Sequence, residues 1–268
     1  MNPKNVAMKQ IFDIKRFGKY FMYDLRQMWT NNGKAAVVIG LSGVAFYSVA
    51  ILWYLLFKGE WNAPGITARA AVFSLSLVAL VFWQSRTYGY VTDKKAGSDW
   101  LMIPASVAEK FISMMVITLI VIPLIFFAVY MAADWVLSVA DPTFGTALFS
   151  LLSSKVPAVF ESIPVHIPGV AAVLSFWSNM LYFLLFGLLL KRCKLIGALA
   201  VLLGIDVLFT SILSNIVSSI DTEKVYSFVE KISGADFNAV WWYLTAVSFL
   251  IVAALAVCSY FRIKTIKH

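Results

Sequence analysis

Charge is scarce in this sequence, and so are cysteine and histidine. Asp, Glu, Lys and Arg make up 13% of the 268 residues and hydrophobic residues make up 61%, against about 25% and about 45–50% in soluble domains. These proportions exclude a soluble globular fold and a disordered chain. The two cysteines cannot frame a disulfide-stapled secreted module, and glycine and proline are not enriched, which excludes collagen. An integral membrane protein is the class that remains.

The motifs of metal and nucleotide chemistry are missing as well. The two histidines are His166 and His268, and the sequence has no HExxH, paired CxxC or GxxxxGK[ST] pattern. We therefore expect no metal site and no nucleotide-binding loop in this chain. If ATP drives the protein, another subunit must bind the ATP and its Mg²⁺. The excess of 22 Lys and Arg over 14 Asp and Glu is attributed to membrane topology, and no nucleic-acid partner is expected.

Six stretches are long and apolar enough to cross a membrane as helices. A crossing needs about 20 mostly apolar residues. The six stretches are residues 35–57, 66–85, 111–132, 168–190, 195–214 and 240–261. The sequence thus predicts an all-α polytopic membrane protein, with a cytoplasmic N-terminal segment at residues 1–34 and a six-helix transmembrane domain at residues 35–268.

Basic residues are unevenly divided between the two sides of these crossings. If the N-terminus is cytoplasmic, 17 of the 22 Lys and Arg lie on the cytoplasmic side and five on the other. Such an excess indicates the cytoplasmic side, so both termini are predicted there. The first 34 residues lack the apolar core and cleavage site of a signal peptide, and the first crossing is expected to stay in the mature protein.

The N-terminal segment contains a predicted basic amphipathic helix at residues 11–28. Apolar side chains recur there at steps of three and four residues, and basic residues fall between them. The apolar residues are Ile11, Ile14, Phe17, Phe21, Leu25 and Met28. With Trp29 at its end, such a helix is expected to lie in the cytoplasmic interface, its cations near anionic headgroups. The alternative is a helix packed on the protein's own cytoplasmic end.

The longest cytoplasmic connection, residues 86–110, joins the second and third crossings. Ser106 followed by Glu109 is a capping-box pattern, in which a hydroxyl and a carboxylate satisfy the first backbone N–H groups of a helix. A helix is therefore predicted to begin there and to run into the third crossing. A rigid element joined in this way transmits displacement better than a flexible linker. The alternative is that the loop caps its own bundle.

Two long segments, residues 133–167 and 215–239, are predicted on the opposite side of the membrane. The first holds an apolar run, Phe144–Leu152, that is too short to cross and is expected to form an interfacial or re-entrant helix. In the second, Asp221 is a predicted N-cap for an outer helix at residues 221–233.

A tight turn is predicted at Lys191–Lys194, which makes the fourth and fifth crossings antiparallel neighbours. Cys193 lies in this turn and Cys258 in the last crossing. Because neither is placed for a structural disulfide, both are expected to be free thiols.

Asp206 is the ionisable residue that lies clearly within a predicted crossing. A carboxylate near the bilayer centre costs about 2.5–3.5 kcal/mol, so Asp206 should face the bundle or a water-filled cavity. It is expected either to line a substrate or proton path or to bridge helices through Asn179, Ser178 or Thr210. Pro123 predicts a kink in the third crossing.

Residues 40–43 spell GLSG, and the chain length and number of crossings are similar to those of rhomboid proteases. A catalytic serine needs a base within hydrogen-bond reach, and neither His166 nor His268 lies in a helix that could face Ser42. That family also carries its serine in the fourth crossing and its histidine in the sixth. Small residues that allow close helix packing explain the GLSG sequence better, and no enzymatic activity is predicted.

Residues Asp99–Phe111 read DWLMIPASVAEKF and resemble a segment of permease subunits of type-2 ABC exporters. The order of parts is also similar: an amphipathic elbow helix, six crossings, and a cytoplasmic helix between the second and third. The resemblance implies that two permease chains, identical or different, form the pathway in a bacterial inner membrane and that a separate ATP-binding cassette subunit docks below. One departure is residues 215–239, which are charged where many members have re-entrant helices.

In the resembling family the short helix between the second and third crossings is the coupling element. The resemblance therefore implies that this loop contacts or orients the ATP-binding subunit, with Trp100 as the anchor because a buried aromatic can dominate an interface. The implied contact residues are Asp99, Trp100, Met102, Pro104, Ser106, Glu109 and Lys110. The elbow-helix residues implied to support the docking site are Phe17, Phe21, Leu25, Met28 and Trp29.

The leading hypothesis is a permease subunit, a transport component whose partners are an ATP-binding subunit, a second permease chain and membrane lipids. A non-transporting integral membrane binding, immunity or assembly protein is the alternative, and it would use the 86–110 loop and the outer segments as binding surfaces. A membrane enzyme that depends on Ser42 is the third hypothesis.

Overall fold

The computed structural model describes residues 12–30, 34–92, 97, 100, 102–150, 166–190, 193–219 and 237–266. Every secondary-structure element in this part of the chain is helical, as predicted. In chain order the elements are α2 (Ile14–Met28), α3 (Lys34–Gly40), α4 (Ser42–Lys58), α5 (Ile66–Thr87), η2 (Gly89–Thr92), α7 (Val107–Val116), η3 (Ile117–Val121), α8 (Ile122–Ala140), η4 (Pro142–Phe144), α10 (His166–Leu189), α11 (Lys194–Ser219) and α13 (Phe237–Thr265).

Five helical stretches among the described residues are long and apolar enough to cross a membrane. They are Lys34–Lys58, Ile66–Thr92, Val107–Ala140, Val170–Leu189 and Thr245–Thr265. Each coincides with one of the predicted crossings, which supports the membrane-protein class by length and composition. The remaining predicted crossing, residues 195–214, falls within α11 but is not one of the five, and the count of six stays a prediction.

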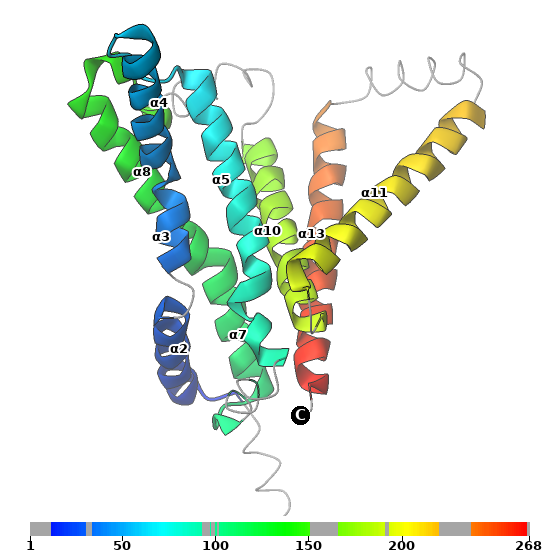
Figure 1. Ribbon diagram of the computed structural model, residues 1–268. Coiled ribbons are helices and arrows are strands. Elements are labelled where there is room, and N and C mark those ends of the chain that lie inside the picture. The colour runs from blue at the N-terminus through cyan, green and yellow to red at the C-terminus, as the bar shows by residue number, and fades with distance from the viewer. Residues whose placement is uncertain are drawn as a thin grey trace, which may run out of the picture.

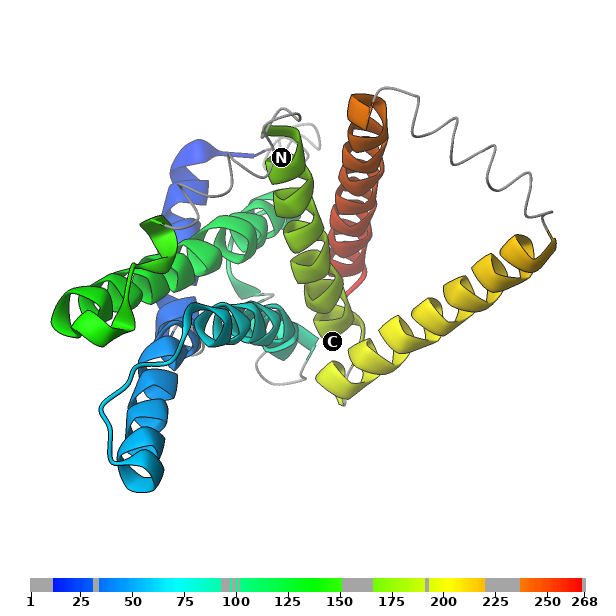
Figure 2. The same cartoon turned by 90° about the horizontal axis from the view of Figure 1, so that it is seen from above.

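The helices form a bundle with two distinct ends (Figure 1). α2, the start of α7 and the last turn of α13 lie together at one end, here called the α2 end, and the described chain begins and ends there. α10 packs against α5 and α13, and α8 packs against α3 and α4. α11 starts beside the end of α10 and then leans away from the other helices (Figure 1 and Figure 2).

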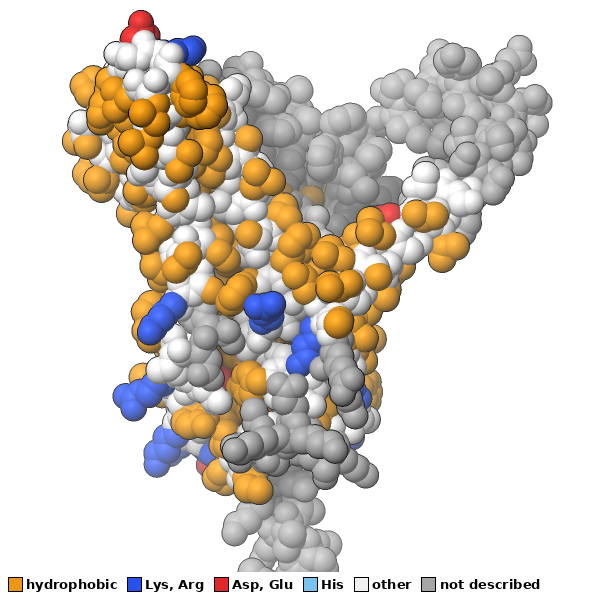
Figure 3. Space-filling view, viewed as in Figure 1, with side chains coloured by type: hydrophobic (Ala, Val, Ile, Leu, Met, Phe, Trp, Pro, Cys, Tyr) orange, Lys and Arg blue, Asp and Glu red, His pale blue; other side chains and the backbone are white. Residues whose placement is uncertain are grey.

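Hydrophobic side chains cover much of the surface along the bundle (Figure 3), and on the same face most Lys and Arg side chains lie toward the α2 end. A largely apolar flank with cations at one end suits a bilayer, because hydrocarbon covers the flank and the cations reach the interface. The side of the membrane on which the α2 end lies remains a prediction.

Small residues allow close contact where the first crossing meets its neighbours. A Cβ atom on Gly40 would lie 3.0 Å from Cβ of Val129 in α8, so a larger side chain would push these helices apart. The Ser42 hydroxyl lies 2.6 Å from the Ser76 hydroxyl of α5. The helix-packing interpretation of the GLSG sequence is therefore confirmed at Gly40.

The third crossing changes its winding in the middle. α7 passes into η3, a π-helical turn, where the N–H of Ile122 donates to the carbonyl of Ile117, five residues back. Pro123 follows as the second residue of α8. Because proline has no N–H and its ring crowds the preceding turn, the α-helical bond pattern cannot continue through it, and a wider turn relieves the crowding. The kink predicted at Pro123 stays a prediction, and what the structure shows is a π-helical turn immediately before this residue.

Several predicted features lie outside the described residues. They are Asp99, residues 191 and 192 of the turn predicted at Lys191–Lys194, and Asp221 with the outer helix at residues 221–233. Cys193 and Cys258 are free thiols, as predicted.

Candidate functional site

The predicted capping box is present at the start of α7. The N–H of Glu109 donates to Oγ of Ser106 at 3.2 Å, and the N–H of Ser106 donates to Oε2 of Glu109 at 2.8 Å. Two N–H groups that the helix leaves unpaired are thus satisfied reciprocally. The prediction that a helix begins at Ser106 and runs into the third crossing is confirmed.

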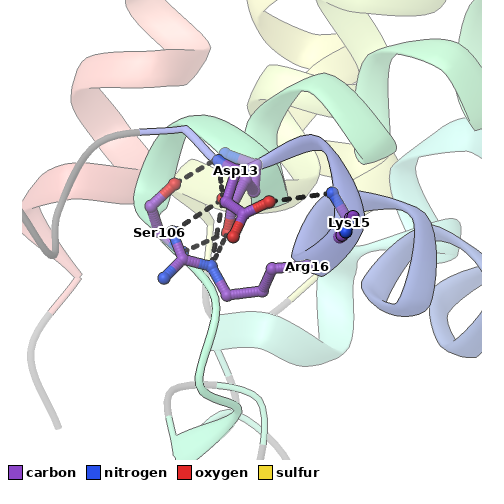
Figure 4. A network of polar contacts seen from close by, with 5 residues as sticks. Asp13, Lys15, Arg16 and Ser106 are labelled. Atoms are coloured by element: carbon purple, nitrogen blue, oxygen red, sulfur yellow. Dashed lines mark hydrogen bonds and ion pairs between the residues drawn. The ribbon is translucent and has the colours of Figure 1, made fainter.

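Glu109 also binds the start of α2 (Figure 4). Its Oε1 accepts from the N–H of Asp13 at 2.9 Å and from Nη2 of Arg16 at 2.7 Å, and its Oε2 accepts from Nε of Arg16 at 2.9 Å. The Glu109 side chain is fully buried, whereas that of Arg16 is 33% exposed. One carboxylate therefore caps α7 and ties α2 to it through a bidentate, charge-assisted pair.

A second buried acid, Asp24, binds the C-terminal half of α2 to its neighbouring helices. Oδ2 of Asp24 accepts from Oγ of Ser113 in α7 at 2.6 Å and from the hydroxyl of Tyr88 at the end of α5 at 3.0 Å. Asp24 is 1% exposed. Burial raises the pKa of its carboxyl, and the two hydrogen bonds only partly offset that effect. α2 is thus joined to α7 at two places.

Sequence reasoning missed Asp24, although a signal was present. Asp24 is four residues after Tyr20 and four before Met28, so the three side chains share one face of α2, and all three are buried. A lone acid on the buried face of an amphipathic helix indicates a specific polar partner, because an unpaired buried carboxylate is costly.

Trp100, the predicted anchor for a partner, is buried in its own chain. It is 3% exposed, and Lys110 beside it is 4% exposed. Nζ of Lys110 donates to the carbonyl of Trp100 at 2.8 Å and lies 4.6 Å from the centre of its ring. Trp100, Glu109 and Lys110 therefore hold the loop in place, and their side chains face the bundle rather than solvent. For these three residues the structure agrees with a loop that caps its own bundle.

The other part of the predicted contact segment is open to solvent. Met102 is 79% exposed and Pro104 is also exposed. A groove of about 620 Å³ begins beside Pro104 and lies between α2, α7 and α13. It is lined by Arg16, Pro104, Ala105, Ser106, Val107, Ala108, Tyr260 and Lys264.

Some of the elbow-helix residues are buried against the protein, and others are exposed. Met28 is buried, and Phe21 and Leu25 pack against the core of the bundle. Phe17 is half-buried and stacks on Phe21 with ring centres 5.9 Å apart. Trp29 is exposed. One face of α2 thus packs on the protein's own end, which is the alternative given in the sequence analysis. The other face is free to contact lipid.

Asp206, Asn179 and Thr210 are not brought together. All three are exposed, and Nδ2 of Asn179 donates to the Ser175 carbonyl of its own helix. The expected helix bridge through Asp206 is absent from the described residues. The physical reason is that α11 leans away from the rest of the described bundle (Figure 2), which leaves Asp206 and Thr210 exposed.

A buried ion pair at the opposite end was not predicted. Nη2 of Arg69 in α5 lies 2.7 Å from Oδ1 of Asp134 in α8, and both side chains are buried. Arg69 also donates to the carbonyls of Phe144 and Thr146, and Oδ2 of Asp134 accepts from the N–H of Leu148. The sequence did contain a signal for this pair, because Arg69 and Asp134 are opposite charges at adjoining ends of the second and third crossings.

Comparison with protein-family models, with curated proteins and with solved structures finds no match for this chain. The described residues are helical, and five of their stretches are long and apolar enough to cross a membrane. Within the described residues no group of three or more His, Cys, Asp or Glu could hold a metal ion. Among the same residues, the α2 end holds a helix pair joined by Glu109 and Asp24, with a groove beside it.

Proposed function

We propose that this chain is the membrane-spanning permease subunit of an ATP-driven ABC exporter. A separate ATP-binding subunit, which carries ATP and Mg²⁺, docks at the α2 end, and a second permease chain completes the pathway. In this proposal six helices cross a bacterial inner membrane and both termini are cytoplasmic. The proposal rests on the Asp99–Phe111 sequence and on the joint between α2 and α7.

The observation that carries the proposal is the position of Glu109. Its carboxylate binds Ser106, Asp13 and Arg16, so the loop, α2 and the start of the third crossing are tied together. α7, the π-helical turn η3 and α8 form one helical stretch, Val107–Ala140. A force applied at Met102 or α2 is therefore delivered to a membrane helix, which is what coupling to a motor requires.

The groove beside this joint has the charge and shape of a docking surface. Its charged lining residues are Arg16 and Lys264, both basic, and its lining includes small residues of the Pro104–Ala108 stretch. Val107 is 37% exposed there. A partner that presents an apolar side chain flanked by carboxylates would match it, because opposite charges at an interface steer association and fix its register.

The test is affinity purification of the full chain, in mild detergent, from the cells that make it. An ATP-binding protein is expected to copurify with the unmodified chain. Lys264→Glu, in the groove, should reduce its amount at least tenfold. Lys19→Glu makes the same charge change on an exposed residue of α2 outside the groove and should leave the amount within twofold. If no ATP-binding protein copurifies with the unmodified chain, the proposal fails.

A second candidate is a non-transporting integral membrane binding, immunity or assembly protein. The burial of Trp100, Glu109 and Lys110 favours it, because three of the seven residues implied by the resemblance are already occupied within the chain. Copurification of a protein without ATP-binding motifs, lost in Lys264→Glu, would select this candidate.

A further inference from the structure

A second groove lies between α2 and the third crossing. It has a volume of about 660 Å³. Its lining residues are Met22, Tyr23, Leu25, Arg26, Met28, Trp29, Val121 and Ile125. None of them lines the groove at Pro104, so the two sites are separate.

The lining of this groove is apolar apart from one cation. Arg26 is its ionisable member other than the Tyr23 phenol, and no carboxylate lines it. Met22, Tyr23 and Trp29 are 64%, 50% and 45% exposed. Apolar and aromatic side chains grouped in this way are poorly matched to water, and they suit the boundary between headgroups and acyl chains.

The groove connects two depths of the proposed membrane. One wall is the last half of α2, the interfacial helix, and the other is Val121 at the end of the π-helical turn with Ile125 one turn further along. A molecule with a charged head at α2 and a hydrocarbon tail along α8 spans both walls. A phospholipid has that shape.

Charge indicates which phospholipid fits. Lys15, Lys19, Met22 and Arg26 follow one another at steps of four, three and four residues, so they share one face of α2, and all four are exposed. This basic stripe ends in the groove at Arg26. A guanidinium binds a phosphate oxygen pair bidentately, and an added negative charge in the headgroup is attracted by the stripe.

We propose that this groove binds an anionic phospholipid, with the phosphate on Arg26, the indole of Trp29 at the headgroup level and an acyl chain against Val121 and Ile125. The lipid fills the gap between α2 and the third crossing at the turn where the crossing changes its winding. The proposal does not depend on an ATP-binding partner, so either proposal can fail without the other.

The test is native mass spectrometry of the full chain released from detergent with phosphatidylglycerol or phosphatidylcholine of the same acyl chains. The unmodified chain is expected to retain phosphatidylglycerol more tightly. Arg26→Ala should weaken that binding about fivefold, the equivalent of about 1 kcal/mol for one basic residue at an anionic surface, and Arg26→Lys should restore part of it. Ile125→Trp, which fills the tail site, should weaken retention of both lipids.

Lys15→Ala is the matched control, because it removes the same charge from the same face of α2 outside the groove. It should change phosphatidylglycerol binding less than twofold. Equal effects of Lys15→Ala and Arg26→Ala would overturn the proposal, since attraction would then belong to the helix surface as a whole. Equal retention of the two lipids, or a lipid-free dimer that Ile125→Trp disrupts, would overturn it as well.

Discussion

Removing the Glu109 carboxylate tests whether the joint between α2 and α7 stabilises the fold. Glu109→Ala leaves the N–H groups of Asp13 and Ser106 without their acceptor and leaves Arg16 without its partner. A buried donor that loses its acceptor costs about 1–3 kcal/mol. Both N–H groups are only partly buried, so the lower part of that range applies. We expect the free energy of unfolding to fall by about 2–3 kcal/mol.

Two other substitutions separate the parts of that loss. Ser106→Ala removes only the hydrogen bond from the N–H of Glu109 to Oγ of Ser106, and loss of an N-cap hydroxyl costs about 1 kcal/mol. Arg16→Ala leaves the buried Glu109 carboxylate without its cation, but the N–H groups of Asp13 and Ser106 still donate to that carboxylate, so its effect should also be smaller than that of Glu109→Ala. The largest destabilisation is thus expected for Glu109→Ala.

The assay is denaturant unfolding of the purified chain in mild detergent, followed by helical circular dichroism. Glu60→Ala serves as the control, because Glu60 is an exposed acid at the opposite end of the bundle, and it should leave the unfolding midpoint unchanged. If Glu109→Ala destabilises no more than Ser106→Ala, the carboxylate acts as a helix cap and nothing else. The argument for a joint between α2 and the third crossing would then be refuted.

Three further predictions concern other buried contacts. Gly187→Ala should destabilise by about 1–3 kcal/mol in the same assay, because its Cβ would lie 3.0 Å from a backbone carbonyl carbon of α5, whereas Gly204→Ala, with open space around it, should not. Arg69→Ala should cost about 3–5 kcal/mol because Asp134 stays buried and unpaired, while Arg69→Met with Asp134→Leu should cost much less. Burial raises the pKa of the Asp24 carboxyl above its ordinary value. The protonated carboxyl therefore contributes stability at low pH, and this stability is lost as the pH rises through the raised pKa. Asp24→Asn should remove that part of the pH dependence of the unfolding midpoint.

Local signals in the sequence predicted the parts of the fold that depend on local physics. The apolar stretches, the period of the helix at residues 11–28 and the Ser106–Glu109 capping box each involve residues close together in the chain. Five of the six apolar stretches, a helix at Ile14–Met28 and the capping box are present in the structure. The outward lean of α11 depends on packing between distant helices. No periodicity within residues 195–214 encodes it, and the exposure of Asp206 therefore could not be predicted from the sequence.

The sequence indicated which residues form the candidate site, but it did not indicate which of their side chains are buried. A tryptophan in a polar loop fits an interface anchor as well as it fits a core residue, because both environments bury an aromatic ring. What decides the case is Lys110, whose amine reaches back ten residues to the Trp100 carbonyl and covers the ring. A contact of that kind follows from the folded path of residues 86–110, which sequence spacing does not give.

The two buried acids explain why α2 has a fixed position on α7. Apolar burial is not directional, so the packing of Met28, Phe21 and Leu25 alone would allow α2 to slide or turn by small steps. Glu109 fixes the first turn of α2, and Asp24, about 12 Å further along the helix axis from Arg16 at 1.5 Å per residue, fixes the third. Two separated directional contacts prevent both rotation and sliding. If a molecule bound in either groove displaces α2, α7 and the third crossing must therefore be displaced with it.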